Sequence, residues 1–539
     1  MKIAEQLWNG LRKIRQVHLF YLILLVNIVI LFTVKLYPSL DGPAHLYNSK
    51  LIYHLIKGDS EAINNFFTFN AFPVPNWLDH IVMAFFYFIA PFWLVEKAYI
   101  IIYLIGLSVS FRLLVLKLNP NDSGLSILIF PFVFNYLFRM GFYNNTISFV
   151  FLFFALYYWL KTRETRGLKK YAVFFVLFTL TYFSNILTFL FLGLVLGLFI
   201  VLHAFSNQKT SAIEPKTLKN VAMQLTGVFI AALPALIMLL LFTINTEMTP
   251  FNSTHDFKYS TDELIKWLND IKSLIVYVYP EEAIISRQFL HLMIAALTCT
   301  IILRTNQLKK SGKGIKELFQ FSDSILLVAL FTLILLFVIP DGQGAGMMSD
   351  RYCLLFFMFS ILWIAVQPIP RGLANVLVLF AIVAHFDLLF YQMKQAIVPL
   401  SKDAETIQKT AQHIEANSIV LPVNFTDNWL EGHLCDYVGV DKPMVVLENY
   451  EATIGWFPLQ WNFNKMPLLL LGDKPSSGDL LWINNTNAPT KKQIDYVMIY
   501  GYAAKLKEAK WATLDSTLNS SYTLIYTAEN YYVTLFKKK

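Results

Sequence analysis

The chain has 539 residues, of which 56% are apolar, 16% are aromatic and only 15% are charged. Soluble domains carry about 25% charged residues. One water-soluble core cannot hide this much apolar surface, so the composition excludes an ordinary soluble protein and predicts a chain partly solvated by lipid. The formal net charge is +8, but the residues from Gln392 onward carry 14 Lys/Arg against 15 Asp/Glu. The positive excess therefore lies in the short loops of the apolar part, which indicates membrane topology and argues against nucleic acid as a partner.

Apolar runs that are each about long enough to cross ~30 Å of hydrocarbon recur along the first three quarters of the chain. In chain order they lie at 19–36, 99–116, 125–138, 147–160, 171–183, 187–203, 221–244, 289–303, 325–339, 354–366 and 373–390. Arg12, Lys13 and Arg15 precede the first run, which ends without a small-residue cleavage site. We therefore interpret this run as a retained helix and not as a signal peptide.

The loops between these runs alternate in charge. Basic residues gather in three of them, at Lys161, Arg163, Arg166, Lys169 and Lys170, at Lys209, Lys216 and Lys219, and at Arg304, Lys309, Lys310, Lys313 and Lys316. The positive-inside rule then places the amino end in the cytoplasm and, for an odd number of spans, the carboxyl end outside. We expect an integral membrane protein of a bacterial inner membrane; an endoplasmic reticulum membrane with a lumenal site is the alternative.

These features predict a polytopic α-helical membrane protein with about eleven spans and a small C-terminal α/β domain. Residues 1–398 would form the transmembrane domain, with a first outer loop at 37–96 and a second at 245–286, and residues 399–539 the extracytoplasmic domain. The apolar stretch 81–92 is expected to be an interfacial or re-entrant helix, with an extra span as the alternative. In the C-terminal domain we predict a helix at 401–417 and strands at 418–423, 444–447, 495–500, 523–526 and 531–536.

The segment Ser39–Tyr47 directly follows the first apolar run. Pro43 suits the first turn of a helix with Asp41 as its N-cap, which places His45 one turn beyond Asp41. A carboxylate beside an imidazole at the membrane surface can act as a base or share a divalent cation. A helix cap followed by an interfacial histidine is the alternative interpretation.

A second acid–imidazole pair, Asp79-His80, lies in the same loop. The pair would either complete a metal or acceptor site with Asp41 or cap the helix that follows. A divalent cation, Mg²⁺ or Mn²⁺, is therefore a candidate cofactor, with Asp41, His45 and Asp79 as candidate ligands.

Two arginines are candidate contacts for an anionic phosphate, because a guanidinium binds phosphate oxygens in a fork. Arg351 follows Asp350 at the outer start of the tenth run, and Arg139 lies beside the third. Snorkelling of either arginine to lipid head groups is the alternative interpretation.

The topology, the acidic residue directly after the first span and the outer C-terminal domain together resemble the GT-C fold of membrane glycosyltransferases, such as the dolichyl-phosphate-mannose-dependent protein mannosyltransferases. At residue level the likeness rests on Asp41–Tyr47 and, more weakly, on Asp350-Arg351-Tyr352. The resemblance implies an inverting transferase that moves a sugar from a polyprenyl-phosphate donor in the membrane lipid to an extracytoplasmic lipid, glycan or protein. Asp41 is followed by Gly42, where the family commonly has a second acidic residue.

Under this interpretation Asp41 is the general base and His45 orients it or binds a metal. The candidate substrate-binding residues are Arg351, Asp350, Arg139, Asp79, His80 and Tyr47. A polar and aromatic group in the C-terminal domain, formed by Asp427, Trp429, His433 and Tyr437, is interpreted as ordinary core and surface residues. The domain is expected to shape acceptor access and not to carry the reaction.

Two other functions stay open. A transporter or flippase would hold ionisable residues inside its bundle, but His291, His385 and Asp387 lie towards the ends of their runs. A non-catalytic scaffold for envelope polysaccharide assembly would keep the architecture and tolerate the loss of Asp41 and Arg351.

Overall fold

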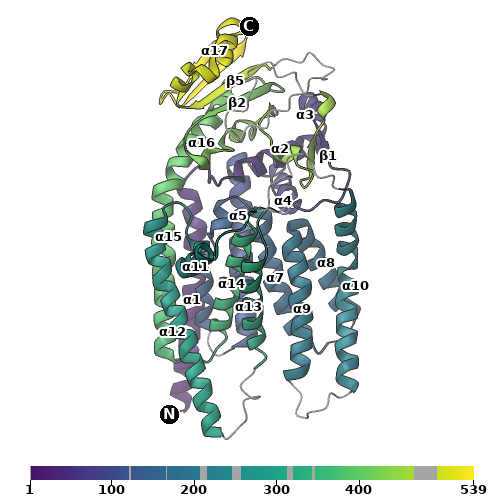
Figure 1. The fold of residues 1–539 in the computed structure, drawn as a ribbon, viewed down its shortest axis with the longest axis vertical. Coiled ribbons are helices and arrows are strands. Elements are labelled where there is room, and N and C mark those ends of the chain that lie inside the picture. The colour runs from purple at the N-terminus through teal and green to yellow at the C-terminus, as the bar shows by residue number, and fades with distance from the viewer. Residues whose placement is uncertain are drawn as a thin grey trace.

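The computed structural model describes residues 2–120, 123–165, 167–206, 215–245, 257–311, 320–342, 346–465 and 494–539. Long helices run side by side in one bundle, with the amino terminus at its lower end (Figure 1). Short helices and the strands form a cap at the upper end, where the carboxyl terminus also lies. The loop cations Arg166, Lys209, Lys313 and Lys316 lie outside the described residues, as do residues 246–256 of the second predicted outer loop.

Seven helices of the described chain are long and apolar enough to cross a membrane. They are α1 (Lys2–Ile30), α5 (Phe92–Leu118), α9 (Ile186–Ser206), α10 (Pro215–Asn245), α12 (Tyr279–Ser311), α14 (Met348–Ala365) and α15 (Arg371–Gln392). Large apolar side chains such as Leu22, Leu240 and Leu379 are more than half exposed on them. Apolar outer surface of this kind is expected where lipid is the solvent, and it indicates an integral membrane protein.

The other four predicted runs do not meet the same combined requirement of length and apolar composition. Three are helices, α7 (Tyr143–Thr162), α8 (Leu168–Ser184) and α13 (Asp323–Val338). At 125–138, where the sequence predicts a span, the structure differs: a 3₁₀ helix, η2 (Ser123–Phe132), is followed by the single turn α6 (Tyr136–Arg139). Pro131 lies inside η2 and lacks the N–H that an α-helix would need. This irregular backbone is buried among α1, α5, α14 and α15, where protein and not lipid surrounds it.

The segment after α1 forms part of the cap. It contains α2 (Gly42–Lys57), α3 (Glu61–Phe66), β1 (Phe67–Phe69) and α4 (Leu78–Tyr87). With ten residues α4 is about 15 Å long, too short to cross a bilayer, which agrees with the prediction of a short helix here and not an extra span. Farther along, α11 (Thr261–Asp270) and the 3₁₀ turn η4 (Lys272–Leu274) occupy the second predicted outer loop.

The C-terminal region contains a mixed sheet of five strands in the order β3-β2-β5-β7-β6. The strands are β2 (Ile419–Phe425), β3 (Val445–Val446), β5 (Tyr496–Gly501), β6 (Tyr522–Thr527) and β7 (Val533–Lys538), so all five predicted strands are confirmed. The pairs β2–β3 and β2–β5 are parallel, and β7 is antiparallel to both β5 and β6. A further helix, α17 (Ala512–Ser521), precedes β6.

No break in the chain marks the predicted domain boundary. Helix α15 continues through a π-helical turn (Met393–Ile397) into α16 (Val398–Thr410), which covers the start of the helix predicted at 401–417. The sheet is therefore joined to the bundle by one continuous helical segment.

The C-terminal region also docks onto the segment after α1. Strand β1 pairs antiparallel with β4 (Leu459–Trp461), and the rings of Phe67 and Trp461 stack 4.3 Å apart. The hydroxyl of Tyr47 donates to the Met444 carbonyl oxygen at 3.0 Å and accepts from the Val446 N–H at 2.9 Å. Tyr47, a predicted substrate contact, is thus fully buried and fastens β3 to α2.

Candidate functional site

Asp41 stands immediately before α2, as the sequence predicts, but its side chain makes no capping hydrogen bond. Ser39 performs that role instead, since its Oγ accepts from the Gly42 N–H at 3.1 Å. The backbone of Asp41 is held on both sides: its N–H donates to the Met140 carbonyl oxygen and its own carbonyl accepts from the His45 N–H. The carboxylate is therefore fixed in place without being used by the helix.

The nearest imidazole to the Asp41 carboxylate is His433 of the C-terminal region, with Nε2 at 3.7 Å from Oδ1. The other ring nitrogen, Nδ1, lies 2.7 Å from Glu448 Oε1, and the Tyr450 ring lies 4.5 Å from the His433 ring. The side chains of Asp41 and His433 are 13% and 14% exposed, whereas Glu448 is buried. Glu448 thus fixes the orientation of the His433 imidazole, which faces the accessible carboxylate of Asp41.

Burial raises the pKa of Asp41 above its usual value, and the nearby imidazoles of His433 and then His45 oppose that rise. A carboxylate with a raised pKa is a stronger proton acceptor once it is ionised. The pair of Asp41 and His433, called the accessible pair below, is therefore suited to general base chemistry.

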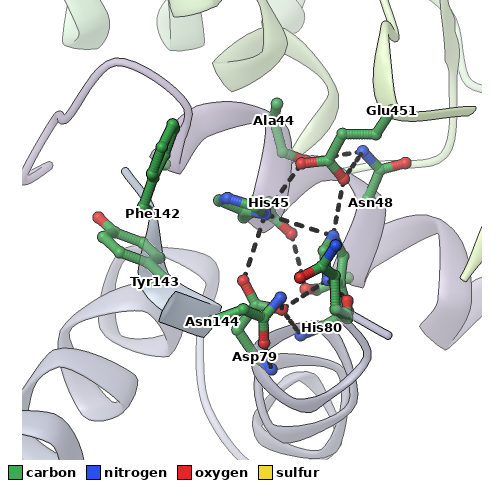
Figure 2. Close-up of polar contacts among 12 residues, drawn as sticks. Ala44, His45, Asn48, Asp79, His80, Phe142, Tyr143, Asn144 and Glu451 are labelled. Atoms are coloured by element: carbon green, nitrogen blue, oxygen red, sulfur yellow. Dashed lines mark hydrogen bonds and ion pairs between the residues drawn. The ribbon is translucent and has the colours of Figure 1, made fainter. Parts of the chain in front are cut away.

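The second feature of the site is a group of four side chains, His45, Asp79, His80 and Glu451, called the buried cluster below. They come from α2, from α4 and from the short turn η10 (Glu451–Thr453), and Figure 2 shows them converging. His45 Nδ1 lies 3.2 Å from Asp79 Oδ2 and 2.9 Å from Glu451 Oε1. His80 bridges the same carboxylates, with Nδ1 at 2.6 Å from Asp79 Oδ1 and Nε2 at 2.7 Å from Glu451 Oε2. The four residues are almost completely shielded from solvent.

Amide side chains hold one oxygen of each carboxylate in the buried cluster. Asn144 Nδ2 donates to Asp79 Oδ1 at 2.5 Å, and Asn48 Nδ2 donates to Glu451 Oε2 at 2.8 Å (Figure 2). Asn144 Oδ1 in turn accepts from the Asp79 N–H at 3.0 Å. Both carboxylates are thereby fixed in orientation, and their other oxygens face His45.

The charges in the buried cluster are strongly coupled. Burial alone would lower the pKa of His80, but Asp79 and Glu451 outweigh it and raise the pKa to about 10. The pKa of His45 is raised as well, because Glu451 and then Asp79 overcome the effect of burial. Burial would raise the pKa of Glu451, yet the two imidazoles hold it below its usual value. Positive charge is therefore strongly favoured at the centre of the buried cluster.

The candidate metal ligands named from the sequence are only partly brought together. His45 and Asp79 meet, and one ligand atom from each of His45, Asp79 and His80 lies within 4.8 Å of the others. Asp41 is not part of this group, because its carboxylate faces His433 while His45 turns towards Asp79. The prediction that His45 orients Asp41 is therefore wrong. The His45 N–H bonds to the Asp41 carbonyl oxygen four residues earlier, but the two side chains have different partners.

Neither Asp79 nor His80 is the N-cap residue of α4, although Asp79 Oδ1 accepts from the His80 N–H in its first turn at 2.6 Å. Its N-cap residue is Trp77, which makes no side-chain capping bond. Asp79 also contacts His45 and Asn144. The polar group around it contains Glu451 and not Asp41, with which the sequence predicted a shared metal or acceptor site.

Arg351 lies in the first turn of α14, at one end of an apolar groove between α7, α9, α13 and α14. Its Nε–H donates to the Gly346 carbonyl oxygen at 3.3 Å, and its guanidinium lies 5.0 Å from the Phe142 ring centroid. In the described part of the chain it forms no ion pair. The Asp41 N–H donates to the Met140 carbonyl oxygen, and the Phe142 ring lies against Arg351. The short segment that contains Met140 and Phe142 therefore lies next to both Asp41 and Arg351. The neighbouring Asp350 is buried.

Arg139 has a different environment. It is fully buried, donates to the hydroxyl of Tyr37 and to Gln392 Oε1, and lies 4.8 Å from the Phe134 ring. The structure thus places it inside the bundle, away from lipid head groups, and does not bring it to the accessible pair or to the buried cluster.

Three functional side chains were missed by sequence reasoning. His433 was interpreted as an ordinary residue of the C-terminal domain, and Glu448 and Glu451 were not singled out. The only local signal is the polar segment Glu448-Asn449-Tyr450-Glu451 directly after a short predicted strand.

No protein-family model matches the chain, and a search of curated proteins finds no relative.

Proposed function

We propose that the protein is a GT-C-type glycosyltransferase that moves a sugar from a polyprenyl-phosphate donor to an extracytoplasmic acceptor, with Asp41 as general base. The observation that carries the proposal is the accessible pair. Asp41 lies shortly after the first candidate span, which ends at Thr33. Its carboxylate is not used for helix capping, and it faces an imidazole that Glu448 orients.

The proposed reaction needs few protein groups. The Asp41 carboxylate takes the proton of an acceptor hydroxyl as that oxygen attacks the anomeric carbon. The bond between the anomeric carbon and the phosphate oxygen breaks, and the polyprenyl phosphate leaves with the electron pair. Attack from the face opposite the leaving group inverts the anomeric centre. His433 stabilises the ionised form of Asp41 before the proton is transferred.

The donor would lie in the groove beside Arg351. Its apolar lining includes Phe149, Leu190, Phe191 and Leu355, which suits an isoprenoid chain. The Arg351 guanidinium lies at the end of this lining and forms no ion pair in the described chain, so it is available for a phosphate.

The acceptor would approach from the cap. The Tyr450 ring lies 4.5 Å from His433 and 6.2 Å from the Phe457 ring, so aromatic faces extend from the accessible pair towards the buried cluster. Aromatic rings stack on the apolar faces of sugars, and this wall supports a carbohydrate-bearing acceptor.

The proposal includes a topology. The amino end would lie in the cytoplasm of a bacterial cell, and eleven crossings, with η2 and α6 as the third, would place the cap outside. The cap segments and the C-terminal sheet lie at the end of the bundle opposite the amino terminus, which supports this orientation (Figure 1).

A direct assay tests the proposal. The purified full-length protein is incubated with a panel of polyprenyl-phosphate sugars and candidate acceptors, and released polyprenyl phosphate is measured. We expect release that Asp41→Asn slows strongly and that a control variant, Asp59→Asn, preserves, since Asp59 pairs with His54 and Lys57 at the far end of α2. Full activity in a folded Asp41→Asn variant would contradict the proposal, and movement of lipid without phosphate release would favour a flippase.

A further inference from the structure

We infer that the buried cluster is a binding site for a divalent transition-metal ion, with His45, Asp79, His80 and Glu451 as its ligands and Zn²⁺ as the best match. This inference does not depend on the transferase proposal. It starts from the convergence of two imidazoles and two carboxylates from three separate segments at one buried point (Figure 2).

Hydrogen bonds alone do not account for the contacts around His45 Nδ1. His45 Nδ1 carries at most one hydrogen, yet Asp79 Oδ2, Glu451 Oε1 and His80 Nε2 all lie within 3.4 Å of it. The contacts of the two oxygens with His45 lack hydrogen-bond geometry, and neither oxygen accepts a hydrogen bond elsewhere in the described chain. Both buried oxygens therefore share one contact, with the same imidazole nitrogen, which cannot donate to both, so a cation held between them would satisfy the two carboxylates better.

The spacing of the ligand atoms suits a metal ion. In a tetrahedral Zn²⁺ site with bonds of about 2.0–2.1 Å, ligand atoms lie about 3.3–3.4 Å apart. The contacts from His45 Nδ1 to Asp79 Oδ2 and His80 Nε2 are 3.2 and 3.4 Å, and the ligand atoms of these three residues all lie within 4.8 Å of one another. Glu451 Oε1 lies 2.9 Å from His45 Nδ1 but stands outside that group of three. Rotation of the Glu451 side chain towards the other three residues would complete a set of four ligands.

The surroundings of the cluster are those of a metal site. Asn144 and Asn48 each hold one oxygen of a carboxylate, which leaves the other oxygen as the ligand atom. His80 Nδ1 lies 2.6 Å from Asp79 Oδ1 and 3.1 Å from the Asn76 carbonyl oxygen, and these contacts fix the ring with Nε2 directed at the cluster. Metal-binding histidines and carboxylates are commonly oriented by such outer hydrogen bonds.

The donor set selects the kind of metal. Imidazole nitrogens favour Zn²⁺ and related transition metals, whereas Mg²⁺ and Ca²⁺ prefer sites made entirely of oxygen atoms. Two carboxylates balance the charge of a divalent ion in this buried position. Four protein ligands with almost no solvent exposure describe a closed site, which is typical of structural metal ions.

The position of the site indicates what the ion does. Its ligands join α2 and α4 to η10, and η10 begins one residue after Tyr450, whose ring contacts His433. The ion would therefore fasten the C-terminal region onto the cap and hold His433 near Asp41, as a positioning element that does not touch the substrate.

Metal analysis of the purified full-length protein, after removal of any affinity tag, is the direct test. We expect stoichiometric zinc by mass spectrometry, and a thermal midpoint that falls after treatment with a strong chelator and recovers on adding Zn²⁺. Replacement by Co²⁺ should give the visible absorption of a tetrahedral site, a readout that does not require enzymatic activity.

Variants locate the metal. His80→Ala and Glu451→Gln should each reduce zinc content at least tenfold, whereas the control His54→Ala, which removes a buried histidine of α2 paired with Asp59, should keep it. Asp41→Asn should also keep its zinc while losing transferase activity, so failure of this inference and failure of the proposed function are distinguishable. Should His80→Ala fail to fold, the chelator and Co²⁺ experiments on the unmodified chain still decide.

Three results would overturn the inference. The first is wild-type protein that holds no zinc when supplied with it and is insensitive to the chelator. The second is retention of Mg²⁺ in place of any transition metal. The third is zinc that stays bound at full stoichiometry in a folded His80→Ala variant.

Discussion

His433 Nε2 lies 3.7 Å from Asp41 Oδ1, although His433 belongs to the C-terminal region and Asp41 to the segment between the first candidate span and α2. The contact forms only when the C-terminal region docks onto the cap through β1, β4 and Tyr47. Under the proposed function, the competence of the general base is thus coupled to that docking, and the C-terminal region does more than limit access to the site.

His433→Gln is expected to shift the acidic limb of the pH–rate profile to higher pH. The His433 imidazole lowers the pKa of Asp41, so its removal raises that pKa and leaves less of the base ionised at a given pH. The maximal rate at high pH should fall less than it does in Asp41→Asn. A pH profile of kcat/KM for the two variants measures this, and an unmoved limb would show that His433 has only a packing role.

Asp41→Asn is expected to lower kcat by about 10²–10⁴-fold, the usual contribution of a general base, while the protein remains at least as stable as the wild type. The pKa of Asp41 is raised on folding, so the ionised carboxylate reduces stability at neutral pH. This cost declines as the pH falls below the folded-state pKa and is gone below the unfolded-state pKa. The carboxylate also makes no capping bond whose loss would weaken α2. Thermal unfolding of both proteins at neutral and acidic pH checks the expectation; a large loss of stability at neutral pH would contradict it.

Local patterns in the sequence were enough to predict much of the secondary structure. Pro43 and Asp41 mark the start of α2 correctly, and five runs rich in branched and aromatic residues became strands. A local pattern does not distinguish an α-helix from a 3₁₀ helix in a wholly buried apolar run, however, and Pro131 was the only sign of the change at 125–138.

The site itself depends on contacts between distant segments. Asp41, His45, Asp79 and His80 were identified because each lies beside another polar residue in one loop. Their actual partners, His433 and Glu451, reach the site only because the C-terminal region docks onto the cap. No spacing between residues in the sequence indicates these contacts. The pairing of His45 with Asp41 failed for this reason: Glu451 competes for the same imidazole from a segment that sequence reasoning assigned to a separate domain.

Tyr47→Phe is expected to destabilise the docked C-terminal region by about 1–3 kcal/mol, because it leaves the buried Met444 carbonyl oxygen and Val446 N–H without their partner. The ring itself is kept, so packing against Gly439 is preserved. Tyr53→Phe is the matched control, since its hydroxyl bonds only to exposed Lys57 in the described structure. Thermal unfolding in detergent measures the difference, and equal midpoints for the two variants would argue against a docking role for Tyr47.

Arg351→Ala is expected to raise KM for the polyprenyl-phosphate donor at least tenfold and to lower kcat, because a charge-assisted contact with the leaving phosphate strengthens as its negative charge develops. Arg351→Lys should recover part of kcat, since an ammonium supplies the charge without the guanidinium fork. The structural cost of either change is small, because the described contacts of Arg351 are one hydrogen bond to Gly346 and the face of Phe142. Steady-state kinetics with donor and acceptor varied separately distinguish the roles: an increase in KM for the acceptor alone would place Arg351 on the acceptor side and would require a different phosphate ligand.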